Sequence, residues 1–330
     1  MSILEVEGKK SLMLFSGRAF PALAAEIAEH VGVTVTPTTA RDFANGEIFI
    51  KSDESVRGSD AFVIQSFTQP INEWMMETLI LLDSLKRASA KRITVVAPFY
   101  PYARQDKKHR GREPISARLV ADLFKTAGAD RLMAVDLHTA QIQGFFDGPV
   151  DHMFALPLLA EYVRGKYGAP DADSDLVVVS PDTGRVRVAE QWADELGGVD
   201  IAFVHKTRSI DVANEVVANR VVGEVAGRTC LLIDDMIDTG GSITKAADLL
   251  FAQGATDVII AATHAIFSPP ATDRLKNSRV AEVIVTNTLP ITPEQDFDKL
   301  TVLSIAPLLA QAIKAVFVDG SVTSLFDGKA

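Results

Sequence analysis

Short runs of apolar residues alternate along most of the chain with longer segments whose apolar residues recur every three or four positions. The short runs are typical of buried β-strands, and the wider spacing is typical of helices with one buried face. In the first half the pattern predicts strands at residues 12–15, 61–65, 93–97 and 132–135, with helices at 21–30, 72–87 and 115–126. In the second half it predicts strands at 176–179, 201–204, 230–233, 258–262 and 283–286.

This alternation predicts an α/β fold in which mostly parallel sheets are flanked by helices on both faces. With 330 residues the chain is long enough for two domains of ordinary size. A loop rich in Gly, Ala, Pro and Asp is expected at residues 165–175. We place the domain boundary just before it, near Leu156, so that the domains are residues 1–155 and 156–305.

Composition limits the partners that the chain can have. The net charge of −10 and the pI near 5.1 argue against a general nucleic-acid-binding surface. Anionic ligands must therefore be met locally, by clustered cations or by a metal. The single cysteine, Cys230, has no partner for an intrachain disulfide, and neither a signal peptide nor an apolar run of about 18 residues is recognisable. We expect a cytoplasmic protein without a membrane segment.

Residues 229–250 carry the most specific chemical signal. The expected strand runs directly into Asp234 and Asp235, and a turn of small residues at 239–242 then leads into a segment with helical spacing. Gly240 and Gly241 allow successive backbone N–H groups to face one anion, and the helix adds its own N-terminal donors. The two acids would repel a bare phosphate but could accept protons from a sugar diol. A ribose phosphate satisfies both requirements.

Other readings of this segment are weaker. The turn lacks the Gly-Lys-Ser/Thr ending of a P-loop, and no G-x-G-x-x-G dinucleotide fingerprint is present. The plain alternative is a buried strand followed by a solvated acidic turn.

Three further strand ends carry chemical groups. Residues 98–112 follow the strand at 93–97 and place five Lys or Arg residues within the last nine positions. Loops at the carboxyl ends of strands bind ligands in α/β folds, so this loop is an anion-site candidate, with a solvated charged loop as the alternative. His138 and Asp182 also follow expected strands. A lone histidine is more often structural than a ligand, but a strand end is a functional position.

Two other segments are ambiguous on their own. Lys206 and Arg208 follow the strand at 201–204 and open a polar stretch that could close over a charged transition state. Taken alone, this stretch reads as a surface loop. Residues 43–47, Phe-Ala-Asn-Gly-Glu, read as a turn between strands.

Taken together, these strings resemble the ribose-phosphate diphosphokinases, or phosphoribosyl pyrophosphate synthetases, of the phosphate-activated class. The resemblance runs from Phe-Ser-Gly at 15–17 through 54–58 to Ser-Val-Thr-Ser-Leu-Phe at 321–326. It implies magnesium-dependent transfer of the β,γ-diphosphoryl group of ATP to the C1 hydroxyl of ribose 5-phosphate. The products are AMP and phosphoribosyl pyrophosphate, which feeds nucleotide, histidine and tryptophan biosynthesis.

The resemblance also implies an architecture. It predicts two tandem phosphoribosyltransferase-like domains, an ATP-side domain at 1–155 and a ribose-5-phosphate-binding domain at 156–305, with the final segment 306–330 returning to the first. The assembly would be a homohexamer, and phosphate and ADP would be effectors.

The roles that the resemblance implies fall into four groups. The catalytic pair would be Lys206 and Arg208, and the Mg²⁺ residues would be His138 and Asp182. Contacts to ATP would come from Arg104 and Gln105 and, from a neighbouring subunit, from Phe43, Asn45, Gly46 and Glu47. Ribose 5-phosphate would be held by Asp234, Asp235, Asp238, Thr239, Gly240, Gly241 and Ser242, with the two leading acids on the 2- and 3-hydroxyls.

The chain departs from the family pattern at a few positions. Arg185 stands where many relatives have a second glycine after Ser-Pro-Asp-Thr-Gly, and Val188 occupies the slot of a usual arginine. Gly111 replaces a frequent serine of the regulatory loop and so lacks its hydroxyl. Ser242 replaces a common threonine but keeps its hydroxyl.

Two rival functions share part of the pattern. A phosphoribosyltransferase has the same loop but leaves the Arg104–Gln105 region and His138 unexplained. A non-catalytic regulatory relative could lack the two cations after the strand at 201–204, yet Lys206 and Arg208 are both present.

Overall fold

The computed structural model describes residues 10–168, 174–208 and 216–326, which fold as two compact units. Unit 1 contains the residues up to Phe154 together with those from Ile305 onward, and unit 2 is Ala155–Ser304. Among the described helices, none is both long enough and apolar enough to cross a membrane.

Unit 1 is built on a five-stranded parallel sheet with the order β1-β4-β5-β6-β7. These strands are β1 (Leu12–Ser16), β4 (Asp60–Ile64), β5 (Arg92–Ala97), β6 (Arg131–Val135) and β7 (Val150–Met153). A separate antiparallel hairpin consists of β2 (Thr38–Asp42) and β3 (Ile48–Ser52). The central strands are buried on both faces, which explains their nearly continuous apolar sequences.

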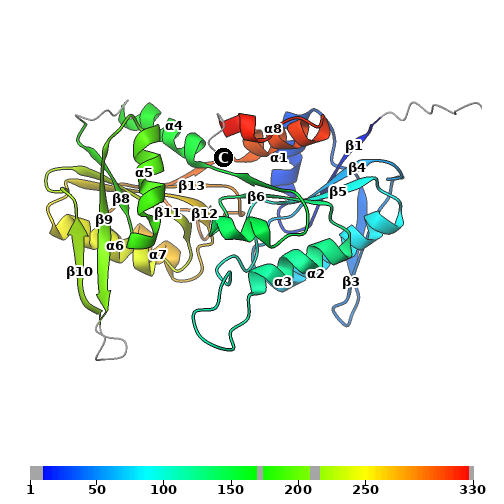
Figure 1. Ribbon diagram of the computed structural model, residues 1–330, viewed down its shortest axis with the longest axis horizontal. Coiled ribbons are helices and arrows are strands. Elements are labelled where there is room, and N and C mark those ends of the chain that lie inside the picture. The colour runs from blue at the N-terminus through cyan, green and yellow to red at the C-terminus, as the bar shows by residue number, and fades with distance from the viewer. Residues whose placement is uncertain (1–9, 169–173, 209–215, 327–330) are drawn as a thin grey trace, which may run out of the picture. The chain divides into compact units, whose positions relative to one another are not determined.

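Helices cover both faces of this sheet. The helices of unit 1 are α1 (Pro21–Val31), α2 (Ile71–Arg87), α3 (Ser116–Ala127) and α8 (Ala306–Phe317). Helix α1 packs against α8 and α2 packs against α3, and Figure 1 shows the two pairs on opposite sides of the sheet. Proline at the first turn and left-handed Gly32 after the last turn define the two ends of α1.

Unit 2 is built on a seven-stranded sheet with the order β10-β9-β8-β11-β12-β13-β14. Every pairing is parallel except that of β10 with β9 at one edge. The strands are β8 (Leu176–Ser180), β9 (Asp200–Arg208), β10 (Val216–Val222), β11 (Thr229–Ile237), β12 (Asp257–Ala265), β13 (Glu282–Thr286) and β14 (Leu300–Leu303).

The helices of unit 2 are α4 (Leu156–Tyr167), α5 (Val186–Glu195), α6 (Gly241–Ala252) and α7 (Ala271–Lys276). Helix α4 contacts α5, and α6 contacts α7, again on opposite sides of the sheet (Figure 1). Cys230 lies in the apolar core between sheet and helices, where burial raises the pKa of its thiol to about 12.

The predicted α/β class with parallel sheets flanked by helices is confirmed, and three details need correction. Strand β11 does not stop at residue 233 but continues through both acids, because Asp234 still pairs with Ala262 of the neighbouring strand. Strand β9 runs on to Arg208 because β10 pairs with it, so Lys206 and Arg208 lie within the strand and not after it. Strands β7, β10 and β14 were not predicted, and β2 and β3 were expected only as strands without stated bounds on either side of the turn at 43–47.

Candidate active site

The glycine turn after β11 forms the N-terminus of helix α6. Gly240 is the N-cap, with φ at 71°, and Gly241 is the first helical residue. A Cβ atom on Gly240 would lie 3.3 Å from the Cα of Ala271, so the backbone conformation and the space both favour glycine. The unpaired N–H groups of the first turn, together with the helix dipole, make this turn suitable for a phosphate.

The turn is fastened from two directions. The hydroxyl of Thr244 donates to the carbonyl of Gly240 at 2.8 Å, and Arg274 Nη1 donates to the carbonyl of Thr239 at 2.9 Å. Asp238 is partly buried at the start of the turn. The structure therefore brings the predicted residues 238–242 together in one ordered loop.

A cleft of about 500 Å³ adjoins this loop. It is lined by Thr239, Gly241, Ser242, Thr244, Lys245, Asp248, Arg274, Asn277, Ser278 and Arg279. Sequence reasoning missed the cations of this cleft, because Lys245 of α6, Arg274 of α7 and Arg279, which follows α7, look like ordinary exposed surface residues in the sequence. Arg279 stacks over the ring of Phe251, with its Cζ 4.1 Å from the ring centroid.

Asp234 and Asp235 lie at the carboxyl end of β11, and both bind Arg185. Arg185 Nε lies 3.1 Å from Asp234 Oδ1, and Arg185 Nη2 lies 2.7 Å from Asp235 Oδ1. Burial and the neighbouring Asp235 raise the pKa of Asp234 to about 8, although Arg185 acts in the opposite direction. Sequence reasoning noted Arg185 only as a departure from the family, since nothing in the sequence places it beside residues about fifty positions away.

Asp182 follows β8 and caps the short turn η2 (Thr183–Arg185). Its Oδ1 accepts the backbone N–H of Gly184 at 2.8 Å. Because β8 and β11 are neighbours in the sheet, their carboxyl ends bring Asp182 and the acid pair to the same edge of unit 2.

Lys206 and Arg208 lie on β9, the other neighbour of β8. In the register with β10, Lys206 faces Asn219 and Arg208 faces Val216. The side chains of both residues, and residues 209–215, lie outside the described part of the structure. The backbone of the predicted catalytic pair is therefore located, but its contacts are not.

In unit 1, the turn that contains Arg104 and Gln105 follows β5. The hydroxyl of Ser116 donates to Gln105 Oε1 at 2.6 Å, and the carbonyl of Gln105 accepts the N–H of Ala117 at 3.1 Å. Arg104 is exposed. The first two residues of helix α3 thus hold the turn in place.

Asp106, which sequence reasoning did not single out, connects this turn to the loop after β6. Asp106 is only 3% exposed, and its carboxylate accepts hydrogen bonds from the hydroxyl of Thr139 at 2.6 Å and from the amide of Gln141 at 2.7 Å. His138, partly buried, immediately precedes Thr139. Strands β5 and β6 are neighbours, so the two predicted loops meet at one edge of the sheet.

The backbone that leads to His138 has an unusual conformation. Asp136 has φ at 39°, and the N–H of Leu137 donates to His152 Nε2 at 2.9 Å. The ring of His152 therefore fixes the turn from which His138 projects.

Phe43, Asn45, Gly46 and Glu47 form the tip of the β2–β3 hairpin. The N–H of Phe43 donates to the carbonyl of Glu47 at 2.8 Å, and Gly46 has φ at 87°. Phe43 is 45% exposed, and Arg41 lies over its ring at 5.3 Å from the centroid. An exposed aromatic ring at a hairpin tip is available to a partner or a ligand.

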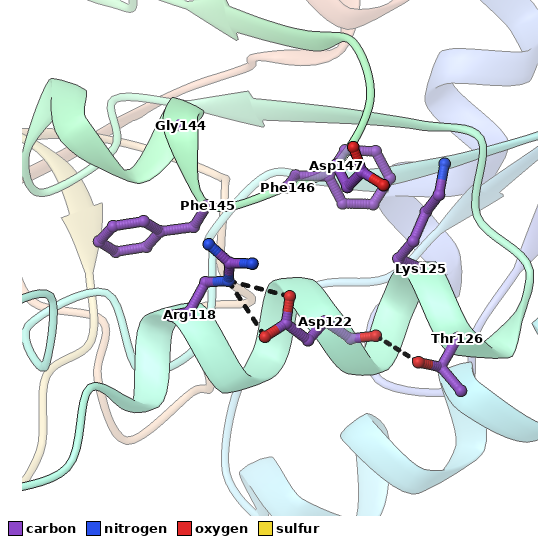
Figure 2. Close-up of a pocket in the computed structure, with 8 residues that line it drawn as sticks. All are labelled: Arg118, Asp122, Lys125, Thr126, Gly144, Phe145, Phe146 and Asp147. Atoms are coloured by element: carbon purple, nitrogen blue, oxygen red, sulfur yellow. Dashed lines mark hydrogen bonds and ion pairs between the residues drawn. The ribbon is translucent and has the colours of Figure 1, made fainter.

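Another cavity of unit 1 does not include these residues. Figure 2 shows it between α3 and the region of the short helix η1 (Ala140–Gly144), with a volume of about 480 Å³. Its Arg118 is bound to Asp122 at 2.9 Å, and Lys125 lies over the ring of Phe146. The cations of this cavity already have partners, so it is not a strong candidate for an anion site.

The fold and the loops at the strand ends define a phosphoribosyltransferase-like α/β protein. Residues 12–128 match the family model for the N-terminal domain of ribose phosphate pyrophosphokinase, and residues 204–327 match the phosphoribosyl synthetase-associated domain. The ribose-phosphate pyrophosphokinase of Mycobacterium leprae is 65% identical over 98% of each chain. That of Streptomyces coelicolor is 65% identical over 99% of each chain.

A solved structure agrees with these matches. The phosphoribosylpyrophosphate synthetase of Mycobacterium smegmatis superposes with a TM-score of 0.89 at 66% identity, covering 94% of this chain and 100% of that chain. The chain belongs to the ribose-phosphate pyrophosphokinase family. The prediction of an enzyme that makes phosphoribosyl pyrophosphate from ribose 5-phosphate and ATP is confirmed.

Proposed function

We propose that the two units divide the substrates of the β,γ-diphosphoryl transfer, with ATP bound by unit 1 and ribose 5-phosphate by unit 2. The observation that carries this proposal is the end of β11, where the partly buried Asp234 and the buried Asp235 are followed within a few residues by a glycine-capped helix N-terminus. Diphosphoryl transfer requires an acceptor that is held and oriented, since positioning and charge neutralisation supply most of the catalysis.

The acceptor site would use both halves of this segment. The N-terminus of α6 and residues 238–242 would bind the 5-phosphate, while Asp234 and Asp235 would accept the protons of the 2- and 3-hydroxyls. Holding the sugar at both ends leaves the C1 hydroxyl directed outward as the nucleophile.

The donor site would use Arg104 and Gln105, which stand on a turn fastened by α3 and by Asp106. Phe43, Asn45, Gly46 and Glu47 would contact ATP from a neighbouring subunit of a homohexamer. The 45% exposure of Phe43 on an exposed hairpin supports this part of the proposal. A single chain would then have an incomplete ATP site.

Magnesium would be held by His138 and Asp182. Among the described residues, no group of three or more His, Cys, Asp or Glu side chains is arranged to hold a metal. A site with few protein ligands suits Mg²⁺, which keeps several waters and is shared with substrate phosphates. The carboxylate of Asp182 is a suitable oxygen ligand, and His138 would act through a bound water. When bound, the ion would neutralise charge on the ATP oxygens.

Lys206 and Arg208 would stabilise the negative charge that develops during transfer, together with Arg104. Phosphate and ADP are the proposed effectors. We propose that they act at the cationic loop of residues 98–112, which contains Gly111. We further propose a cytoplasmic location, for which the buried, unpaired thiol of Cys230 is the supporting observation.

The test is a reaction mixture of ATP, ribose 5-phosphate and Mg²⁺ without any nucleobase. We expect stoichiometric AMP and phosphoribosyl pyrophosphate. Release of ADP instead, or a requirement for a base, would contradict transfer of the β,γ-diphosphoryl group to ribose 5-phosphate. Repeating the assay across phosphate and ADP concentrations tests the proposed effectors.

A further inference from the structure

Arg185 enters the ribose side of unit 2 because two neighbouring strands end at different levels. The last pairing of β11 with β8 joins Leu232 to Val179, and β8 ends one residue later. Strand β11 continues to Ile237, so Asp234 and Asp235 lie beyond the end of β8. Arg185, the last residue of the turn η2, lies beyond the end of β8 and beside these two acids.

The guanidinium group of Arg185 binds the two acids through different nitrogens. Its Nε is 3.1 Å from Asp234 Oδ1 and its Nη2 is 2.7 Å from Asp235 Oδ1. The backbone N–H of Asp235 also donates to Asp234 Oδ1 at 2.9 Å. A guanidinium is a rigid planar fork, so these bonds fix the separation and the orientation of the two carboxylates.

The contact is largely shielded from solvent. The side chain of Arg185 is 19% exposed, and those of Asp234 and Asp235 are 20% and 8% exposed. Burial, and then repulsion by the adjacent Asp235, raise the pKa of Asp234. Arg185 supplies the opposing positive charge.

We propose that Arg185 is a positioning residue for ribose 5-phosphate, which holds Asp234 and Asp235 in the arrangement that receives the sugar diol. This inference rests on the proposed function of the two acids. A carboxylate has about four acceptor positions, so binding Arg185 through Oδ1 is compatible with accepting sugar hydroxyl protons.

The test compares Arg185→Gln with Arg187→Gln in the full-length protein. Arg187 lies two residues further along the chain and is exposed, and its substitution by Gln changes the net charge by the same amount. Calorimetric titration with ribose 5-phosphate alone, and KM values for both substrates, are the measurements. For Arg185→Gln we expect the affinity for ribose 5-phosphate to fall about tenfold or more, because misplaced binding groups lose much of their effect. The KM for ATP should change less than twofold, and Arg187→Gln should match the wild type.

A conservative variant keeps the proposal testable if Arg185→Gln does not fold. Lysine retains the positive charge but cannot bind both acids with a fixed fork, so Arg185→Lys should weaken ribose 5-phosphate binding by an intermediate factor. Unchanged or tighter binding of ribose 5-phosphate in whichever variant folds would overturn the proposal. A loss confined to kcat, or shared equally by the KM for ATP, would also overturn it.

Asp234→Asn and Asp235→Asn separate this inference from the proposed function on which it rests. If both variants bind ribose 5-phosphate normally, the acids do not hold the diol and the proposed function is wrong at this point. If they lose binding while Arg185→Gln retains it, only the role of Arg185 is wrong.

Discussion

Arg18 holds Asp42, the last residue of strand β2, through two hydrogen bonds of 2.7 and 3.1 Å. The same guanidinium reaches Glu77 of helix α2, which is completely buried. The hairpin whose tip carries Phe43 is thus connected through one arginine to the core of unit 1.

The two ends of this connection are expected to differ in their effect on stability. Arg18→Ala leaves the buried carboxylate of Glu77 without its cation, although Gln65 still donates to it. We expect a loss of about 2 to 3 kcal/mol in the free energy of unfolding, measured by urea denaturation. Asp42→Asn removes an exposed partner and should leave the denaturation midpoint almost unchanged. Equal losses in the two variants would show that the buried end of the connection does not matter.

The conformation of the turn at Gly240 predicts that alanine is tolerated less well there than at another glycine of unit 2. Gly240→Ala would place a side chain in a left-handed conformation and press its Cβ against Ala271, so we expect weaker ribose 5-phosphate binding and a loss of about 1 to 3 kcal/mol in stability. Gly227 is the matched control, because its φ is 74° and no atom lies within 4 Å of a Cβ placed there. Gly227→Ala should cost only the backbone strain and leave substrate binding intact, as titration calorimetry can show.

Glu282 predicts acid sensitivity in unit 2. Its side chain is 5% exposed and accepts hydrogen bonds from Tyr162 at 2.7 Å and Lys166 at 2.8 Å. These partners and further hydroxyl donors hold the pKa of Glu282 below its usual value, despite the opposing effect of burial. The contribution of Glu282 to the stability of the fold is therefore fully present above the ordinary pKa of a glutamate. It is lost as the pH falls through the lowered pKa of the folded state.

The measurement for Glu282 is chemical denaturation of the wild type and Glu282→Gln at several pH values. We expect the variant to be less stable by about 1 to 3 kcal/mol at pH 7. The difference should narrow in acid as the wild-type carboxylate is protonated. A constant difference across the pH range would argue against a role for the charge.

Asp234 predicts the opposite pH dependence. Because burial and the neighbouring Asp235 raise its pKa, Asp234 releases its proton at a higher pH in the folded state than in the unfolded state. Its effect on stability is most favourable below the ordinary pKa of an aspartate, and it is lost progressively as the pH rises toward 8. An asparagine at this position cannot ionise, so Asp234→Asn should not lose stability in this way as the pH rises. The variant should melt at a higher temperature than the wild type at pH 8 but not at pH 4. A lower melting temperature at pH 8 would refute the expectation.

Lys206 predicts a purely kinetic effect. Under the proposed mechanism, Lys206→Ala should lower kcat about a hundredfold or more, with little change in stability, by analogy with the loss of one electrostatic donor. Arg220→Ala, on the paired strand β10, provides a control cation outside the proposed site. Near-normal turnover of the Lys206 variant in the AMP assay would remove this residue from the catalytic role.

Some of these features could be predicted from the sequence, and others depended on tertiary structure. The acids and glycines after residue 229 are contiguous, so their chemistry was readable from one segment. The bounds of strand β2 were not predicted because its residues, Thr-Thr-Ala-Arg-Asp, are mostly polar and only partly buried in a two-stranded hairpin. The end of β11 was placed too early because an acid is an unusual residue within a buried strand.

The long-range contacts could not have been predicted from local patterns. Arg185 meets Asp234 only because β8 and β11 become neighbours, and strand order is a property of the whole sheet. Asp106 was overlooked for the same reason, since an aspartate within a cationic loop resembles a surface residue. Its burial follows from the packing of the loops after β5 and β6.

The return of α8 to unit 1 has a consequence for the synthesis of the chain. Residues 306–317 pack against α1, yet they leave the ribosome after every residue of unit 2. Unit 2 is therefore complete in the nascent chain while the apolar surface that α8 will cover in unit 1 is still exposed. The half of the protein that is translated first is the last to be finished, and a prematurely terminated chain would be defective in unit 1 even when unit 2 is intact.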